Sequence, residues 1–144
     1  ETLDRLMPQM PRQVPRYLMG VGTPEDFFLA IERGVDMFDC VHPTRIARHG
    51  AVFTRTGRID LSAQKWQLDE GPIDPECLCY ACRHFPRGYL RHLFKAQEIL
   101  ALRLASLHNI TFMLDLMREI REHLAAGSFR AFRDRFLARY LGKE

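Results

Sequence analysis

The pattern of apolar and polar positions up to residue 41 differs from that in the rest of the chain. Short apolar runs at residues 16–21 and 37–41 predict two buried strands, and residues between them have helical spacing. Thr23 fits the N-cap of that helix, Pro24 its first turn and Gly34 its end. A strand, helix, strand order predicts a βαβ unit in a parallel sheet, which needs more strands than this chain supplies. We therefore expect an excerpt of a larger α/β fold.

The segments on either side of this unit have less regular patterns. Residues 1–15 contain three prolines and predict an irregular connection. Residues 42–50 predict a polar, basic loop. The alternating stretches at residues 51–54 and 58–61 predict a β-hairpin that turns at Thr56-Gly57.

Helical periodicity dominates the C-terminal part. One helix is predicted from Pro86 to about residue 100 and a longer one from about residue 109 to 125, stopped by Gly127. A last helix follows Ser128. The apolar stripes of the long and last helices predict core positions; they are Ile110, Met113, Leu114, Met117, Ile120 and Leu124, and then Phe129, Phe132, Phe136 and Tyr140.

Composition narrows the class of protein. The 144 residues, of which 47% are hydrophobic, suffice for one domain with a core. The apolar runs are shorter than the roughly 20 residues of a membrane span, and residues 1–5 do not resemble a signal peptide, so we expect a cytoplasmic protein. A net charge of +3 is too small to indicate a polyanion partner by itself. Four arginines, at positions 45, 48, 55 and 58, would suit phosphate contacts, although a solvated loop is the more usual explanation of such a charge run.

The cysteines carry the clearest chemical signal. Cys77, Cys79 and Cys82 lie within six positions, and thiols at this spacing favour thiolate ligands over disulfides in a chain without a secretory signal. A Cys₃His zinc site then lacks one imidazole. Of the six histidines we expect His108 to supply it, because it opens the predicted long helix after an excursion that can return the chain to the cysteines. The alternative is a group of buried thiols beside an unrelated helix-capping histidine.

These features together resemble the C-terminal part of the queuine-type tRNA-guanine transglycosylases, from about residue 15 to the end. The matching stretches are Pro15-Arg16-Tyr17-Leu18-Met19-Gly20-Val21-Gly22, Asp36-Met37-Phe38-Asp39-Cys40-Val41, Pro43-Thr44-Arg45 with Ala47-Arg48, Asp74-Pro75-Glu76-Cys77 with Cys79 and Cys82, and His108-Asn109. The family has a (β/α)₈ barrel with an inserted zinc subdomain. The resemblance therefore implies that residues 1–41 end the barrel, residues 42–108 form the basic loop, hairpin and zinc-binding subdomain, and residues 109–144 form C-terminal helices packing on the barrel.

The family exchanges guanine at the anticodon wobble position of tRNA for a 7-deazaguanine. By resemblance, Asp39 is the nucleophile that bonds covalently to tRNA, and its place at the end of a predicted parallel strand agrees with that role. Met19 and Gly20 match the segment that contacts the base. Arg45 and Arg48 match arginines that hold the tRNA, and we expect arginines to help keep Asp39 ionised.

Two further expectations concern partners and alternatives. Phe85, Tyr89 and His92 recur at helical spacing, and family homodimers suggest that they form a dimer interface in the zinc subdomain; packing on the chain's own zinc loop is the alternative. A non-catalytic, zinc-bearing tRNA-binding or partner subunit of the same family is the second functional hypothesis. A purely structural zinc domain would explain the cysteines but leave the strand-end Asp39 unexplained.

Overall fold

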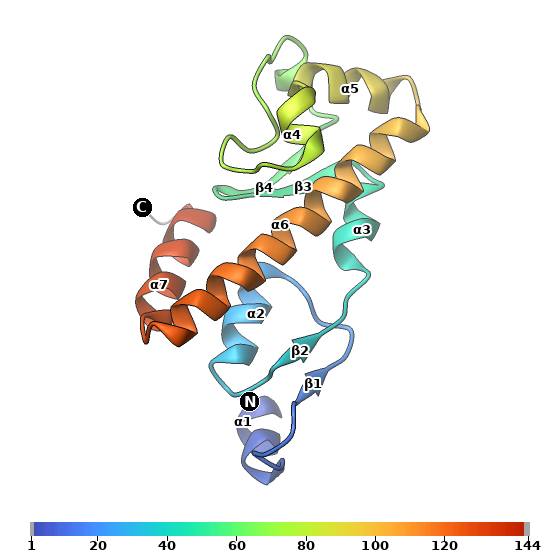
Figure 1. Cartoon of the computed structure of the whole chain (residues 1–144). Coiled ribbons are helices and arrows are strands. Elements are labelled where there is room, and N and C mark those ends of the chain that lie inside the picture. Colours follow the sequence, from blue (N-terminus) through green and yellow to red (C-terminus); the bar gives the residue numbers. More distant parts are fainter. Residues whose placement is uncertain (1, 143–144) are drawn as a thin grey trace. The chain divides into compact units, whose positions relative to one another are not determined.

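A computed structural model describes residues 2–142, which divide into two compact units that meet in sequence at His42 and Pro43 (Figure 1). Helices and short strands are mixed in both units, which confirms the predicted α/β class.

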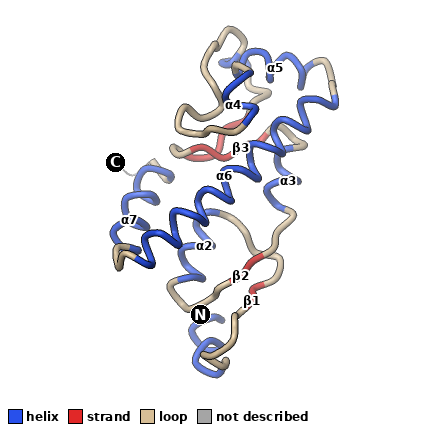
Figure 2. The backbone as a smooth tube through the Cα atoms, viewed as in Figure 1, coloured by secondary structure: helices blue, strands red, loops and turns tan. Residues whose placement is uncertain are grey.

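The first unit contains a βαβ arrangement, as predicted. Its elements are α1 (Thr2–Leu6), the 3₁₀ helix η1 (Met7–Gln9), β1 (Tyr17–Leu18), α2 (Pro24–Ile31) and β2 (Met37–Phe38). The strands pair in parallel, with Tyr17 opposite Met37 and Leu18 opposite Phe38 (Figure 2). They are shorter than predicted, in part because Gly20 has a positive φ of 73° and bends the chain just after β1.

Helix α2 starts as the sequence predicts. Oγ1 of Thr23 accepts a hydrogen bond from the backbone N–H of Asp26 at 3.2 Å, and Pro24 occupies the first turn. The helix ends at Ile31, three residues before Gly34, which has a φ of 92°. Phe27 packs on Phe38 of β2 with ring centroids 4.8 Å apart, so α2 contacts the strand pair through this ring.

The predicted connection over residues 1–15 is partly helical. Helix α1 precedes the first proline, Pro8, and the prolines therefore do not interrupt it. Met7 of η1 is buried in a small core with Ala30 and Val35. This local packing explains why the segment is ordered.

The second unit is built around one long helix. Its elements are α3 (His42–Ala47), β3 (Ala51–Thr54), β4 (Gly57–Asp60), η2 (Gln64–Trp66), α4 (Tyr80–His84), α5 (Arg87–Lys95), α6 (Ile99–Ala125) and α7 (Phe129–Tyr140). Strands β3 and β4 form the predicted antiparallel hairpin, but Thr54 lies opposite Gly57, so the turn is at Arg55-Thr56, one residue earlier than predicted. Helix α6 contacts β3, α4, α5 and α7.

The predicted basic loop after residue 41 is wrong for its first half, which forms α3. Pro43 lacks an N–H, and the first turn of a helix does not need one, so its presence is compatible with a helix start. The N–H of Arg48 donates to the carbonyl of Thr44 at 3.2 Å, and Gly50 with a φ of 84° ends the turn that follows. The sequence lacked the apolar periodicity that would have indicated so short a helix.

The predicted boundary between the two middle helices is also wrong. Helix α5 ends at Lys95 and α6 begins at Ile99, ten residues before the predicted start. The break lies at Gln97, which adopts a φ of 58° without being glycine, so no residue type marked it in the sequence. His108 consequently lies inside α6 instead of opening it.

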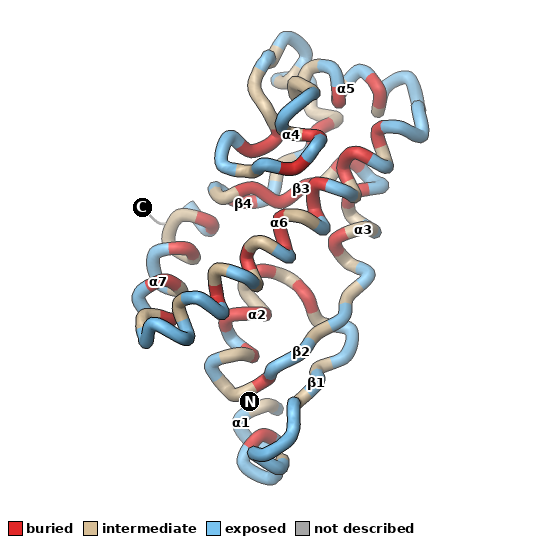
Figure 3. Tube along the Cα trace, viewed as in Figure 1, coloured by how far each residue is buried: buried red, intermediate tan, exposed pale blue. Residues whose placement is uncertain are grey.

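One face of α6 forms the core of the second unit (Figure 3). Its buried side chains are Ala101, Leu104, Ala105, His108, Asn109, Phe112, Met113, Leu116 and Ile120. Met113 and Ile120 confirm the predicted stripe, but Ile110, Leu114 and Leu124 are exposed, because the buried face is rotated toward β3 and α4. The buried stripe of α7, Phe129, Phe132, Phe136 and Tyr140, is confirmed.

Helix α6 is also the one described helix with the length and hydropathy of a membrane span. Its most apolar 18-residue window has a mean hydropathy of 1.3, and 44% of that window is buried inside the protein. Its packing against the hairpin and three helices accounts for that apolar composition.

Candidate functional site

Four side chains that are far apart in the sequence meet in the second unit. Cys77, Cys79, Cys82 and His108 offer ligand atoms that all lie within 4.8 Å of one another. Nδ1 of His108 is 3.5 Å from Sγ of Cys79 and 3.3 Å from Sγ of Cys82. The structure therefore brings together the four residues predicted as metal ligands.

The turn that carries the first cysteine is fixed by Asp74, a buried carboxylate. Its Oδ1 accepts from the N–H of Glu76 at 2.9 Å, and its Oδ2 accepts from the N–H of Arg55 in the hairpin turn at 2.7 Å. The carbonyl of Asp74 accepts from the N–H of Cys77 at 3.2 Å. Asp74 thus attaches the cysteine loop to the hairpin.

The other two cysteines belong to the start of α4. Cys79 is the N-cap of this helix, and its Sγ accepts from the N–H of Cys82 at 3.4 Å. Cys82 lies one turn into the helix, so the cap geometry points both sulfurs to the same side. A helix N-terminus also favours negative charge, which suits a thiolate.

His108 reaches the cysteines from the middle of α6. Its Nε2 is 2.7 Å from the carbonyl oxygen of Phe53 in β3. A carbonyl can only accept, so Nε2 carries the hydrogen and Nδ1 presents its lone pair to the sulfurs. An imidazole held by a backbone carbonyl in this way is the usual arrangement of a metal-binding histidine.

The sulfurs influence one another's ionisation. Hydrogen bonds from Cys77 and then Cys82 lower the pKa of the Cys79 thiol to about 3. The pKa of Cys82 is raised, because its hydrogen is shared with Cys77 and Cys79 and because it is partly buried. One thiolate forms easily in this cluster, and a cation is needed to stabilise further ones.

These donors fit one metal ion. Three thiolates and one imidazole at these separations match tetrahedral coordination with ligand bonds of about 2.0–2.3 Å. Four protein donors leave no open position, so a metal here would be structural. The cluster can hold one ion between the cysteine loop, α4 and α6.

A second group of functional candidates lies in the first unit, at the C-terminal end of β2. Asp39 follows this strand directly, and its Oδ1 accepts from the hydroxyl of Tyr17 at 2.7 Å and from the N–H of Gly20 at 3.2 Å. These two hydrogen bonds, the one from Tyr17 first, lower the pKa of Asp39. The same contact raises the pKa of Tyr17, which remains a hydrogen-bond donor. Asp39 is therefore an exposed, ionised carboxylate held in one orientation.

Further residues lie near Asp39 where the two strands end. Tyr17 and Met37 are register partners in the strand pair. Met19, in the turn that follows β1, is 73% exposed. Beyond it, a Cβ on Gly22 would lie 2.5 Å from Cβ of Cys40, so only glycine allows the two strand ends to approach this closely.

The remaining predicted residues lie in the second unit. Arg45 is within α3 and Arg48 just follows it, and both are exposed. The ring of Phe85, which follows α4, stacks on the ring of Tyr89 in α5 with centroids 5.4 Å apart. His92 is exposed on α5. Phe85 also packs against the buried core around α4 and α6.

Two residues of these sites have no predicted role in the sequence. Tyr17 is one, although pairing of the two predicted parallel strands places Tyr17 and Asp39 on one face. The sequence predicts that arginines keep Asp39 ionised, whereas the structure supplies Tyr17 and the N–H of Gly20. The other residue is Asn109, whose buried side chain follows His108 on α6.

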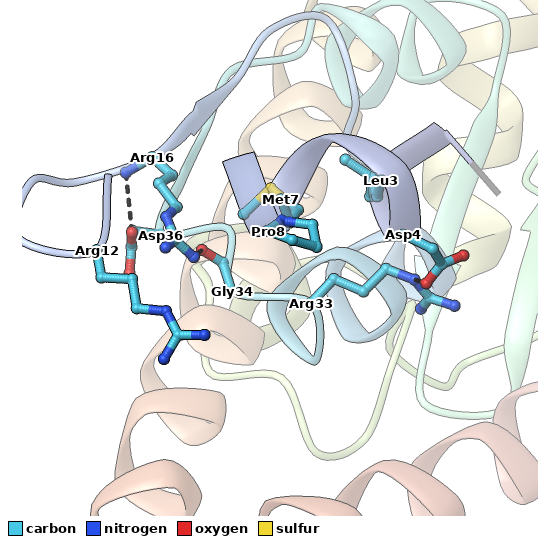
Figure 4. A pocket seen from close by; sticks show the side chains of 9 residues that line it. All are labelled: Leu3, Asp4, Met7, Pro8, Arg12, Arg16, Arg33, Gly34 and Asp36. Carbon is cyan, nitrogen blue, oxygen red and sulfur yellow. Dashed lines mark hydrogen bonds and ion pairs between the residues drawn. The ribbon is translucent and has the colours of Figure 1, made fainter. Parts of the chain in front are cut away.

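A cavity of about 490 Å³ in the first unit lies at the opposite ends of the strands (Figure 4). Several of its charged groups have partners: Nε of Arg33 binds Asp4 at 2.7 Å, and the backbone N–H of Arg16 donates to Asp36 at 2.8 Å. The Arg16 guanidinium donates to backbone carbonyls, among them that of Pro11. We assign this cavity a structural role.

The chain is of the mixed α/β class and has two candidate sites. Asp39, at the end of the strand pair, is the catalytic candidate, and the Cys₃His cluster is the metal-binding candidate. The family model described as queuine tRNA-ribosyltransferase matches residues 1–142. The chain is 54% identical over 138 residues to a queuine tRNA-ribosyltransferase of Desulforudis audaxviator, covering 96% of this chain and 37% of that protein. It is 54% identical over 140 residues to that of Symbiobacterium thermophilum, covering 97% of this chain and 35% of that protein.

A queuine tRNA-ribosyltransferase of Fusobacterium nucleatum is 48% identical over 141 residues, covering 98% of this chain and 38% of that protein. The chain belongs to the queuine tRNA-ribosyltransferase family. The chain spans between a third and two fifths of the length of these three relatives.

Proposed function

We propose that this chain is the C-terminal part of a tRNA-guanine transglycosylase, which exchanges guanine at the tRNA wobble position for a 7-deazaguanine through a covalent aspartyl-tRNA intermediate. The observation that carries this proposal is Asp39, a carboxylate at the end of a parallel strand that Tyr17 and Gly20 keep ionised and oriented. In parallel α/β sheets, reacting groups gather at this end of the strands.

The reaction needs two displacements at C1′ of the ribose. The hydrogen bonds from Tyr17 and Gly20 engage Oδ1 of Asp39, so we assign the attack to Oδ2. Oδ2 forms a bond to C1′ as the bond from C1′ to N9 of guanine breaks, and guanine leaves with that electron pair and takes up a proton. N9 of the incoming base then loses its proton and attacks C1′, and the carboxylate of Asp39 leaves. Two inversions give overall retention.

The neighbouring residues have roles in binding. Met19 is exposed in the turn after β1, next to Gly20, whose N–H binds Asp39. The thioether of Met19 can lie against a purine ring, while Gly20 leaves room for the base to approach the backbone. Arg45 and Arg48 are exposed on and beside α3 and can contact phosphates next to the extruded guanine. These contacts would offset part of the unstacking free energy.

We propose zinc as the metal of the Cys₃His cluster. Thiolates with one imidazole favour Zn²⁺ over harder ions such as Mg²⁺. Bound zinc would fix the loop of Cys77 and the start of α4 to α6, and it would take no part in the base exchange.

The larger architecture is also a proposal. A two-stranded parallel sheet leaves unpaired strand edges, which further strands of a (β/α)₈ barrel would complete. Residues 1–41 would then end the barrel, residues 42–108 would form the zinc-binding region, and residues 109–144 would supply C-terminal helices that pack on the barrel. We further propose a homodimer through Phe85, Tyr89 and His92. Tyr89 is 40% exposed and belongs to an aromatic cluster formed by Tyr80, Phe85 and Tyr89.

The second functional hypothesis is a non-catalytic tRNA-binding or partner subunit. An oriented and ionised Asp39 favours the enzyme, since binding alone does not require it.

The test compares Asp39→Asn with Asp36→Asn in the full-length protein. Asparagine can still accept from Tyr17 and Gly20 but cannot bond to C1′, so we expect loss of the denaturant-resistant adduct with tRNA and of base exchange, by about 10³-fold or more. Asp36 lies at the other end of the strand pair and its variant should retain both. An adduct that persists in Asp39→Asn would remove Asp39 as the nucleophile.

A further inference from the structure

Asn109 follows the metal-ligand candidate His108 on α6, and its side chain is completely buried. Its Oδ1 accepts from the backbone N–H of Phe53 at 3.0 Å. Its Nδ2 donates to the carbonyl of Pro43 at 2.9 Å and to the carbonyl of Ala51 at 3.2 Å. One amide therefore joins α6 to strand β3 and to the first turn of α3.

Consecutive residues of α6 bind both backbone polar groups of one residue of β3, Phe53. Nε2 of His108 donates to the carbonyl of Phe53, while Oδ1 of Asn109 accepts from the N–H of Phe53. The metal cluster and Asn109 thus fix this strand jointly. Because a buried amide is costly without partners, the three contacts of Asn109 also define one arrangement of the strand and α3.

Helix α3 depends on such an anchor. It has six residues, His42–Ala47, and a helix of this length is unstable without tertiary contacts. The bond from Asn109 reaches it at Pro43, two positions before Arg45. The same Nδ2 of Asn109 also binds the carbonyl of Ala51, the first residue of β3, which lies three residues after Arg48. The chain is therefore held on both sides of α3.

We propose that Asn109 is a positioning residue for tRNA binding: it holds α3 so that Arg45 and Arg48 are presented in a fixed geometry. This inference rests on the proposed function, because it takes these arginines as the tRNA contacts. In addition, α6, the core helix that carries the metal-ligand candidate His108, sets the position of α3, the proposed tRNA-binding helix.

The experiment uses the full-length protein with Asn109→Asp, Asn109→Ser and the control Thr111→Val. Aspartate retains the acceptor for Phe53 but loses both donors to Pro43 and Ala51. Serine is too short to reach these carbonyls and avoids a buried charge. Thr111 lies on the same helix and its hydroxyl donates to Leu107 within α6, so its variant should behave as wild type.

Three readouts separate positioning from general destabilisation. Metal analysis first establishes that each variant retains its zinc. Hydrogen exchange is then measured for the amides of Arg48, His49 and Gly50, which close the turns of α3, with amides of α7 as the reference. Steady-state kinetics with tRNA give KM and kcat separately.

We expect α3 amides to exchange about tenfold faster or more in the Asn109 variants, with α7 unchanged, and the KM for tRNA to rise about tenfold with little change in kcat. Unchanged exchange in α3, or equally faster exchange in α7, would overturn the positioning role. Faster exchange in α3 with an unchanged KM would leave Asn109 as the anchor of α3 and would instead overturn the tRNA role of Arg45 and Arg48.

Discussion

The hydroxyl of Tyr17 donates to Oδ1 of Asp39 at 2.7 Å, across the parallel pair of β1 and β2. This hydrogen bond is the largest cause of the lowered pKa of Asp39. It also occupies one carboxylate oxygen and leaves the other for chemistry. Tyr17, to which the sequence assigned no role, therefore binds the proposed nucleophile, Asp39.

The first prediction concerns the pH dependence of Tyr17→Phe. A lowered pKa keeps Asp39 ionised at neutral pH, and activity is lost as the pH falls through that pKa. Removing the Tyr17 hydroxyl raises the pKa of Asp39, so the acid limb of kcat/KM should move to higher pH. At neutral pH we expect a loss of only about two- to tenfold. Tyr80→Phe in the other unit is the control, and coincident acid limbs for Tyr17→Phe and wild type would contradict the prediction.

The second prediction concerns the metal. In His108→Ala one of four ligands is missing, so affinity for zinc should fall by about 100-fold or more, and the midpoint of thermal unfolding should fall with it. Elemental analysis after dialysis against a weak chelator, together with calorimetry, measures both effects. His84→Ala is the matched control, because His84 lies on α4 outside the cluster. Full zinc content in His108→Ala would assign the fourth ligand to another residue.

The third prediction concerns self-association. Tyr89 stacks on Phe85 and is partly exposed, so truncation to alanine removes a large part of the proposed interface. In Tyr89→Ala we expect the dimer dissociation constant to rise about thirtyfold, measured by sedimentation of the full-length protein. Leu68→Ala provides a control because Leu68 is exposed and lies outside the aromatic cluster. A dimer of unchanged affinity would indicate that these rings serve only the chain's own packing.

The sequence alone determined those features that depend on residue type and short spacing. Thr23 and Pro24 fixed the start of α2, because cap and first-turn preferences are local. Cys77, Cys79 and Cys82 indicated a metal site, since thiols spaced within one loop and one helical turn can lie close enough to bind one ion. The parallel strands followed from their order along the chain.

Only the tertiary structure decided where the long helices begin and which groups complete each site. Gln97 separates α5 from α6 in a backbone conformation that its residue type does not favour, so packing and not local preference sets the break. Tyr17 reaches Asp39 through strand register, and Asn109 reaches Phe53 and Pro43 across more than fifty positions of sequence. Such contacts require distant segments to be brought together by the core, and a one-dimensional pattern of polar and apolar residues does not encode which partners will meet.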